Sequence, residues 1–138
     1  MRASTSGSRP SFVQLRFVAI LAGGAGGALA RGGLQRAFPA DGGWPWGTFI
    51  ANLAGTFVLG WLVTRLTERV APTRLWRPFL GTGLCGAFTT FSAFQVETIT
   101  LAKDGRTALA VLYALTSLVL GLTLAAGASV LARSRRYG

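Results

Sequence analysis

The amino-acid sequence predicts an all-α membrane protein, a single domain built from four transmembrane helices. Of its 138 residues, 51% are hydrophobic and 13% are charged, against the ~25% charged residues of ordinary soluble domains. The apolar residues gather in four runs, and each reaches the ~20 residues that a helix needs to cross a bilayer. The 14 Lys and Arg residues lie at the ends of these runs, not along one face. That placement is typical of membrane proteins, so we expect a lipid bilayer as partner and no nucleic acid.

The predicted helices follow one another with only short polar or basic segments between them. We expect them at residues 12–31, 46–66, 76–101 and 107–131. The tryptophans lie near the ends of the runs, where aromatic rings favour the interface of lipid and water: Trp44, Trp46, Trp61 and Trp76. The transmembrane domain is then expected at 12–132, between a disordered basic tail at 1–11 and a basic tail at 133–138.

The first run is rich in small residues at helical spacing. Gly23 and Gly27 are four residues apart, as are Ala22, Gly26 and Ala30. Both sets would let helix backbones approach closely in a membrane. A cleavable signal peptide is the alternative, because two arginines precede the run and Ala-Leu-Ala near its end fits a cleavage site. The density of glycine favours a packed transmembrane helix.

Basic residues predict the orientation. If all four runs cross, both tails and the segment between the second and third helices share one side. That side holds ten basic residues: Arg2, Arg9, Arg16, Arg65, Arg69, Arg74, Arg77, Arg133, Arg135 and Arg136. The other side holds four: Arg31, Arg36, Lys103 and Arg106. The positive-inside rule places both termini in the cytoplasm.

The third run contains "GTGLCGAFTTFSAFQVE", which is unusually polar for a membrane span. Three glycines weaken the helix ahead of Thr89 and Thr90, and threonine is a good N-cap, so a second half-helix could begin there. Carbonyls freed by such a break can coordinate a cation. Beyond the break, Phe91 and Phe94 share a helix face. The alternative is a kinked packing helix whose phenylalanines face neighbouring helices.

Polar residues also line single faces of the second and fourth runs. Thr48, Asn52 and Thr56 are spaced by four, as are Tyr113 and Ser117. The Asn52 amide would either hydrogen-bond to a neighbouring helix or donate to a passing anion.

Catalysis is not expected from this composition. The sequence has no histidine and a single cysteine, Cys85, so no nucleophile and base can be paired through histidine. Glu97 is the only acid well inside a run, and we expect it to have a hydrogen-bonding role near the membrane interface, with ion handling as the lesser option.

Three segments together carry a family resemblance: "GGAGGALARGGL", "GTFIANLAGTFVLG" and "GLCGAFTTFSAFQVET". They closely resemble the signatures of the Fluc (CrcB) family of bacterial fluoride channels, over about residues 12–132. The resemblance implies antiparallel dimers of four-helix subunits in the bacterial inner membrane, with two fluoride pores and a structural Na⁺ at the dimer centre. It implies passive export of fluoride from the cytoplasm, which reduces fluoride toxicity.

The resemblance also implies roles for individual residues. The carbonyls of Gly86 and Thr89 would hold the Na⁺. The pore residues would be Asn52, Phe91 and Phe94, with Thr48, Tyr113 and Ser117 at polar pore-side positions. Arg31 matches a basic position in the vestibule of the pore.

Elementary chemistry agrees with a fluoride path. Fluoride is strongly hydrated, so a filter must replace its water shell without binding the ion too tightly to release it. Phenylalanine edges carry partial positive charge and can face an anion without a full charge. No Lys or Arg lies near the middle of any run.

The sequence differs from the family pattern in two ways, one concerning the pore and one concerning the assembly. Gly121 lies where many family members have a pore-side serine. The family's dual topology predicts an even distribution of Lys and Arg, but the count here is 10 to 4. The chain is therefore expected to form a homodimer or to pair with a homologous, oppositely oriented subunit.

Two other functions are compatible with parts of the sequence. A small proton-coupled drug exporter would need a carboxylate near mid-membrane, and Glu97 is the only candidate. A non-transporting membrane scaffold subunit would explain the small-residue faces but not the Thr-Thr-Phe break.

Overall fold

All regular secondary structure that the computed structural model describes, in residues 11–68 and 75–134, is helical. The elements are α1 (Phe12–Ala37), α2 (Trp46–Glu68), η1 (Arg77–Cys85), α3 (Gly86–Phe88), α4 (Phe91–Lys103) and α5 (Thr107–Ser134). The prediction of an all-α fold is confirmed. Most of the two predicted tails lies outside the described residues, as does the segment 69–74.

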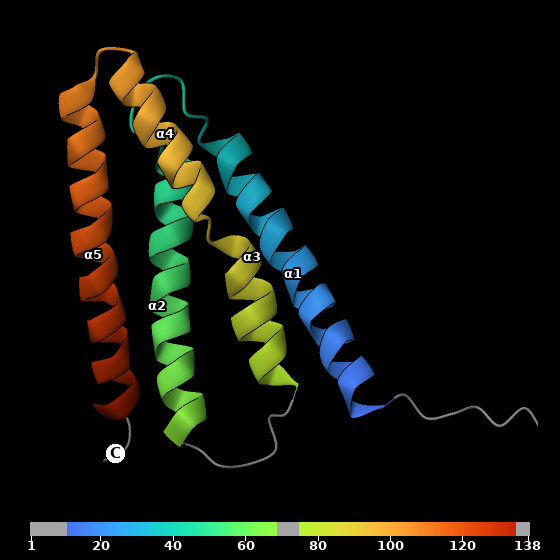
Figure 1. Cartoon of the computed structure of the whole chain (residues 1–138). Coiled ribbons are helices and arrows are strands. Elements are labelled where there is room, and N and C mark those ends of the chain that lie inside the picture. The colour runs from blue at the N-terminus through green and yellow to red at the C-terminus, as the bar shows by residue number, and fades with distance from the viewer. Residues whose placement is uncertain (1–10, 69–74, 135–138) are drawn as a thin grey trace, which may run out of the picture.

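The helices run up and down beside one another (Figure 1). α1 and η1 begin, and α2 and α5 end, at one end of the molecule, which we call the tail end. At the opposite end, the loop end, Arg106 donates a hydrogen bond to the Gly42 carbonyl. This bond ties the loop before α2 to the loop before α5.

Each predicted helix extends beyond its predicted C-terminal end, and α1 and α5 extend the furthest. α1 continues to Ala37 and α5 to Ser134. The backbone hydrogen bonds of a helix do not depend on apolar side chains, so a helix can continue past the hydrocarbon region of the bilayer. Ser11, assigned to the tail, caps α1: its hydroxyl accepts from the Gln14 backbone N–H at 3.3 Å, and the Gln14 side chain accepts from the Ser11 N–H at 2.7 Å. This pair is a capping box.

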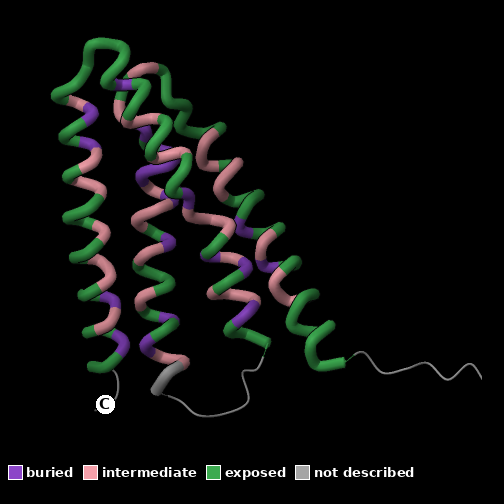
Figure 2. Tube along the Cα trace, viewed as in Figure 1, coloured by how far each residue is buried: buried purple, intermediate pink, exposed green. Residues whose placement is uncertain are grey.

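The exposed surface is largely apolar. α1, α5 and residues Trp46–Leu66 of α2 are long and apolar enough to cross a membrane. Many side chains on these helices are highly exposed, among them Leu21 at 71%, Leu29 at 76% and Leu122 at 66%. Figure 2 shows exposed residues along α1 and α5. So much apolar surface is costly in water, and the chain is a membrane protein.

Glycines set the contact between α1 and η1. A Cβ at Gly23 would overlap the Phe79 carbonyl, and one at Gly27 would overlap the Leu84 carbonyl. From the other side, a Cβ at Gly83 would lie 2.6 Å from the Ile20 carbonyl oxygen. The predicted close approach through Gly23 and Gly27 is confirmed, and α1 is an integral part of the fold. The second predicted set, Ala22, Gly26 and Ala30, is exposed.

Replacing Gly27 with alanine is expected to lower the stability of the fold by about 1–3 kcal/mol, since overpacking must push backbones apart. Gly32→Ala is the matched control on the same helix, because its Cβ would meet nothing within 4 Å. Thermal denaturation of both variants in detergent measures the difference. Equal losses at the two positions would show that the contact between α1 and η1 does not hold the fold.

The third predicted helix is interrupted, as expected from its sequence. α3 ends at Phe88, and Thr89 (φ −83°, ψ 152°) and Thr90 (φ −148°, ψ 120°) are extended. The Thr90 hydroxyl accepts from the Ala93 backbone N–H at 3.3 Å and so caps α4. The half ahead of the break, η1, is a π-helix, which the sequence analysis did not predict.

Candidate functional site: a polar and aromatic groove at the helix break

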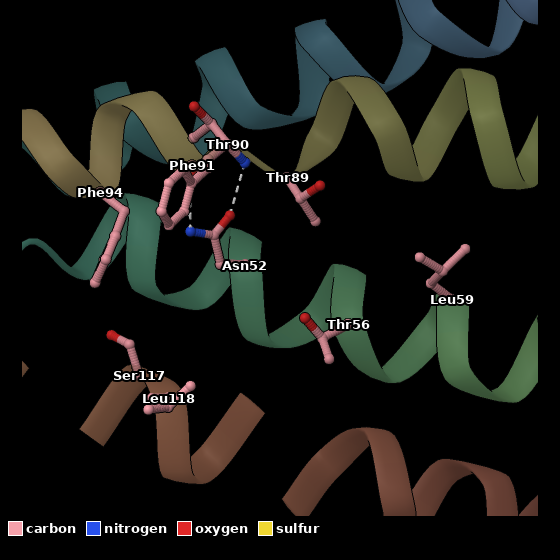
Figure 3. Close-up of a pocket in the computed structure, with 9 residues that line it drawn as sticks. All are labelled: Asn52, Thr56, Leu59, Thr89, Thr90, Phe91, Phe94, Ser117 and Leu118. Carbon is pink, nitrogen blue, oxygen red and sulfur yellow. Dashed lines mark hydrogen bonds between the residues drawn. The ribbon is translucent and has the colours of Figure 1, made fainter. Parts of the chain in front are cut away.

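A groove of about 330 Å³ lies between α2, the break and α5 (Figure 3). It contains four polar uncharged side chains, two phenylalanines and two leucines, besides the threonine that caps α4. Its lining is Asn52, Thr56, Leu59, Thr89, Thr90, Phe91, Phe94, Ser117 and Leu118. No lining residue carries a charge, so the groove offers dipoles without a fixed ion.

Asn52 holds the break in place. Its Nδ2 donates to the Thr90 carbonyl at 3.0 Å, and its Oδ1 accepts from the Thr90 backbone N–H at 2.7 Å. The amide thus satisfies both backbone groups of one residue at the point where the helix ladder stops. An amide nitrogen carries two hydrogens, so one Nδ2 hydrogen remains beyond the bond to Thr90. Both expected roles, contact between helices and donation into the groove, are compatible with this geometry.

The two phenylalanines lie together on the α4 side of the groove. Their ring centroids are 5.9 Å apart with 27° between the planes. Phe91 is 70% exposed, whereas Phe94 also packs against Tyr113, with centroids 5.2 Å apart. Phe91 therefore has little packing role within the chain, and Phe94 joins the groove to the core.

Ser117 brings a hydroxyl from α5 to the groove (Figure 3). Its oxygen is buried and has no hydrogen-bond partner among the described residues. A buried hydroxyl without a partner is costly. An anion in the groove would give this O–H an acceptor.

Thr48 and Tyr113 lie outside the lining of the groove, in a buried network at the loop end. Thr48 donates to Glu97 Oε1 at 2.6 Å, and Tyr113 donates to Oε2 at 2.9 Å. Gln35, which the sequence analysis missed, donates to the Thr48 hydroxyl at 3.5 Å. The network joins α1, α2, α4 and α5, so Glu97 has the hydrogen-bonding role expected for it. Both of its carboxylate oxygens are engaged within the chain.

Two further predicted positions also lie outside the lining. Arg31 is half-buried on α1. Gly121, one turn beyond Ser117 on α5, has open space around it, since an added Cβ would meet nothing within 4 Å. The polar track on α5 therefore ends at Ser117 within this chain.

Two backbone carbonyls beside the break have lost their usual donors. In a continuous helix, Gly86 would accept from the Thr90 N–H and Thr89 from the Ala93 N–H. Here Thr90 donates to Asn52 and Ala93 donates to the Thr90 hydroxyl. Gly86 is exposed, and an added Cβ there would approach no atom closer than 3.8 Å. Packing within the chain therefore does not explain this glycine.

The fold and the groove define a class, that of helical membrane proteins in which uncharged polar and aromatic side chains gather at a broken helix. Within this class the chain belongs to the CrcB family. The family model described as "CrcB-like protein, Camphor Resistance (CrcB)" matches residues 18–129. The membership suspected from the sequence motifs is thereby confirmed.

Curated relatives match over most of their length. The chain is 46% identical to "Fluoride-specific ion channel FluC 1" of Mycobacterium bovis, across 92% of this chain and 97% of the relative. It is 48% identical to the protein of the same name from Mycolicibacterium paratuberculosis, across 75% and 80%. Identity to "Fluoride-specific ion channel FluC" of Oceanobacillus iheyensis is 42%, across 77% and 82%.

Proposed function

We propose that this protein is a passive, fluoride-selective channel, not an enzyme, that exports fluoride from the cytoplasm and so reduces its toxicity. The observation that carries the proposal is the groove, in which Ser117, Asn52 and two phenylalanines meet without any charged residue. The names of the relatives support the same ion. Passive release of fluoride from liposomes that contain only this protein tests the proposal.

The groove suits an anion that must be held weakly. The Ser117 hydroxyl and the second Asn52 hydrogen can replace part of the water shell of fluoride, and the edges of Phe91 and Phe94 add partial positive charge. α4 begins beside the groove, and the positive end of a helix dipole favours an anion there. A lysine or arginine in the lining would bind the ion too tightly to let it leave.

The complete channel is proposed to be an antiparallel dimer of subunits that each cross the membrane four times, with η1, α3 and α4 together forming the third crossing. Two features of the single chain support a partner. The small-residue face of Ala22, Gly26 and Ala30 is exposed, and the space around Gly86 is open. The second subunit is either a copy of this chain or a homologous one.

A structural Na⁺ at the dimer centre is proposed to bind the carbonyl oxygens of Gly86 and Thr89. The residues fit this ion, because hard cations prefer oxygen ligands and these carbonyls have lost their helical donors. Two oxygens are too few for such an ion, so the partner would supply the others. The ion would bridge the two breaks and would not move with fluoride.

Removal of sodium is expected to weaken the dimer or abolish fluoride flux, with poor replacement by lithium or potassium. Dimer stability and flux in buffers of each cation measure the effect. Gly86→Leu should cause similar damage, since the side chain would close the approach to the carbonyls. Full flux and unchanged dimer stability without sodium would contradict the Na⁺ site. Gly86 would then serve only in packing between the subunits.

Both termini are proposed to lie in the cytoplasm of a bacterial cell, with the tail end at the inner face of the plasma membrane. In a Cys85→Ser background, Ser134→Cys is expected to react with a membrane-impermeant thiol reagent mainly from the cytoplasmic side. Asp104→Cys, at the loop end, should react mainly from outside, since basic residues favour the inner side by 10 to 4. Equal labelling of either cysteine from both sides would indicate dual topology and a homodimer.

A further inference from the structure

A second groove lies at the tail end, between α1 and the start of η1. It has a volume of about 370 Å³ and is lined by Ala19, Leu75, Trp76 and Phe79. The two helices touch where Gly23 meets the Phe79 carbonyl, and they diverge from there toward the tail end (Figure 1). Within the described part of the chain, the groove is therefore closed toward the membrane centre and open toward the tail end.

The lining is apolar and largely uncovered. Trp76 is 58% exposed and Leu75 is 37% exposed, and Trp76 packs edge-on against Phe79 with ring centroids 5.9 Å apart. Tryptophan favours the interface between lipid tails and headgroups. The groove thus begins at the level of the lipid headgroups and extends into the hydrocarbon region, parallel to the acyl chains.

Two arginines lie next to lining residues of this groove in the sequence. Arg16 lies one helical turn before Ala19, on the same face of α1 and toward the tail end. Arg77 follows Trp76 directly, and both arginines are exposed. Neither α1 nor η1 contains an acidic residue. A ligand with an apolar tail and an anionic head would match the groove and its rim.

We propose that this groove binds an anionic phospholipid of the inner leaflet. One acyl chain lies against Trp76 and Phe79, and the phosphate lies between Arg16 and Arg77. Two arginines at the surface supply selectivity over a zwitterionic headgroup, about fivefold for each. The site lies on the α1 side of the molecule, away from the groove of Asn52 and Ser117, so it does not depend on the ion that the protein conducts.

Fluorescence quenching by brominated lipids tests the proposal in the intact protein. The full chain and its Trp76→Phe variant are reconstituted in phosphatidylcholine bilayers that contain phosphatidylglycerol, with bromine on the acyl chains of one lipid at a time. The difference between the two proteins isolates the quenching of Trp76. We expect brominated phosphatidylglycerol to quench Trp76 far more than its share of the bilayer predicts, and Arg16→Gln and Arg77→Gln each to reduce this preference about fivefold.

One control separates a site from general attraction. Arg133→Gln removes a charge at the same end but on α5, so it should leave the preference unchanged. Equal quenching of Trp76 by the two lipids would overturn the proposal, as would an equal effect of Arg133→Gln. Quenching of Trp76 by neither lipid would also overturn it, because protein would then cover the groove.

Discussion

Fluoride flux is expected to fall at least about tenfold when Phe91 is replaced by isoleucine, because the positive ring edge is lost while bulk and apolarity are kept. Phe91 gives the cleaner test of the two groove phenylalanines. It is 70% exposed, so the substitution should leave the stability of the subunit almost unchanged. Flux per assembled protein, measured with a fluoride electrode, reports the effect.

Phe94→Ile is expected to reduce flux as strongly but also to lower stability, since Phe94 packs against Tyr113. Phe57→Ile on α2 is the matched control, because Phe57 is also exposed and does not line the groove. If all three variants conduct like the parent, the groove phenylalanines serve only in packing. Loss of flux in Phe57→Ile alone would place the path elsewhere.

The break in the third helix could be predicted because its causes are local. Glycines that weaken a helix and a threonine that can cap the next one are properties of neighbouring residues, and Thr90 takes that capping role. The same is true of Gly23 and Gly27, whose spacing alone places them on one face of α1. Such features need no knowledge of the other helices.

The π-helix η1 could not be predicted in the same way. Its widened turns lie against α1, where Gly83 faces the Ile20 carbonyl and the backbone of Gly24. Sequence spacing within the third run says nothing about how closely α1 approaches. The π-helical pattern of η1 thus coincides with a tertiary contact that only the structure reveals.

Residue spacing places three polar residues on one face of α2 but does not show that their surroundings differ. Thr48, Asn52 and Thr56 share one face, as expected, but each meets a different neighbour. Thr48 donates to Glu97, Asn52 binds the break, and Thr56 lines the groove. The helices around α2 tilt across that face, so residues one turn apart contact different partners. Gln35 was missed for the same reason, since its partner is on another helix.

The central claim, that the groove conducts fluoride and rejects larger anions, is tested most directly by anion release from liposomes. Liposomes that contain the purified protein are loaded with potassium salts of fluoride and chloride, and valinomycin starts the efflux by letting K⁺ leave. Ion-selective electrodes then record both anions, with protein-free liposomes as the control. The proposal predicts rapid loss of fluoride while chloride is retained, since the Ser117 and Asn52 donors and the phenylalanine edges of the groove suit a small, strongly hydrated anion. Equal efflux of the two anions would contradict it, whereas no fluoride efflux beyond that of protein-free liposomes would exclude a channel built from copies of this chain alone.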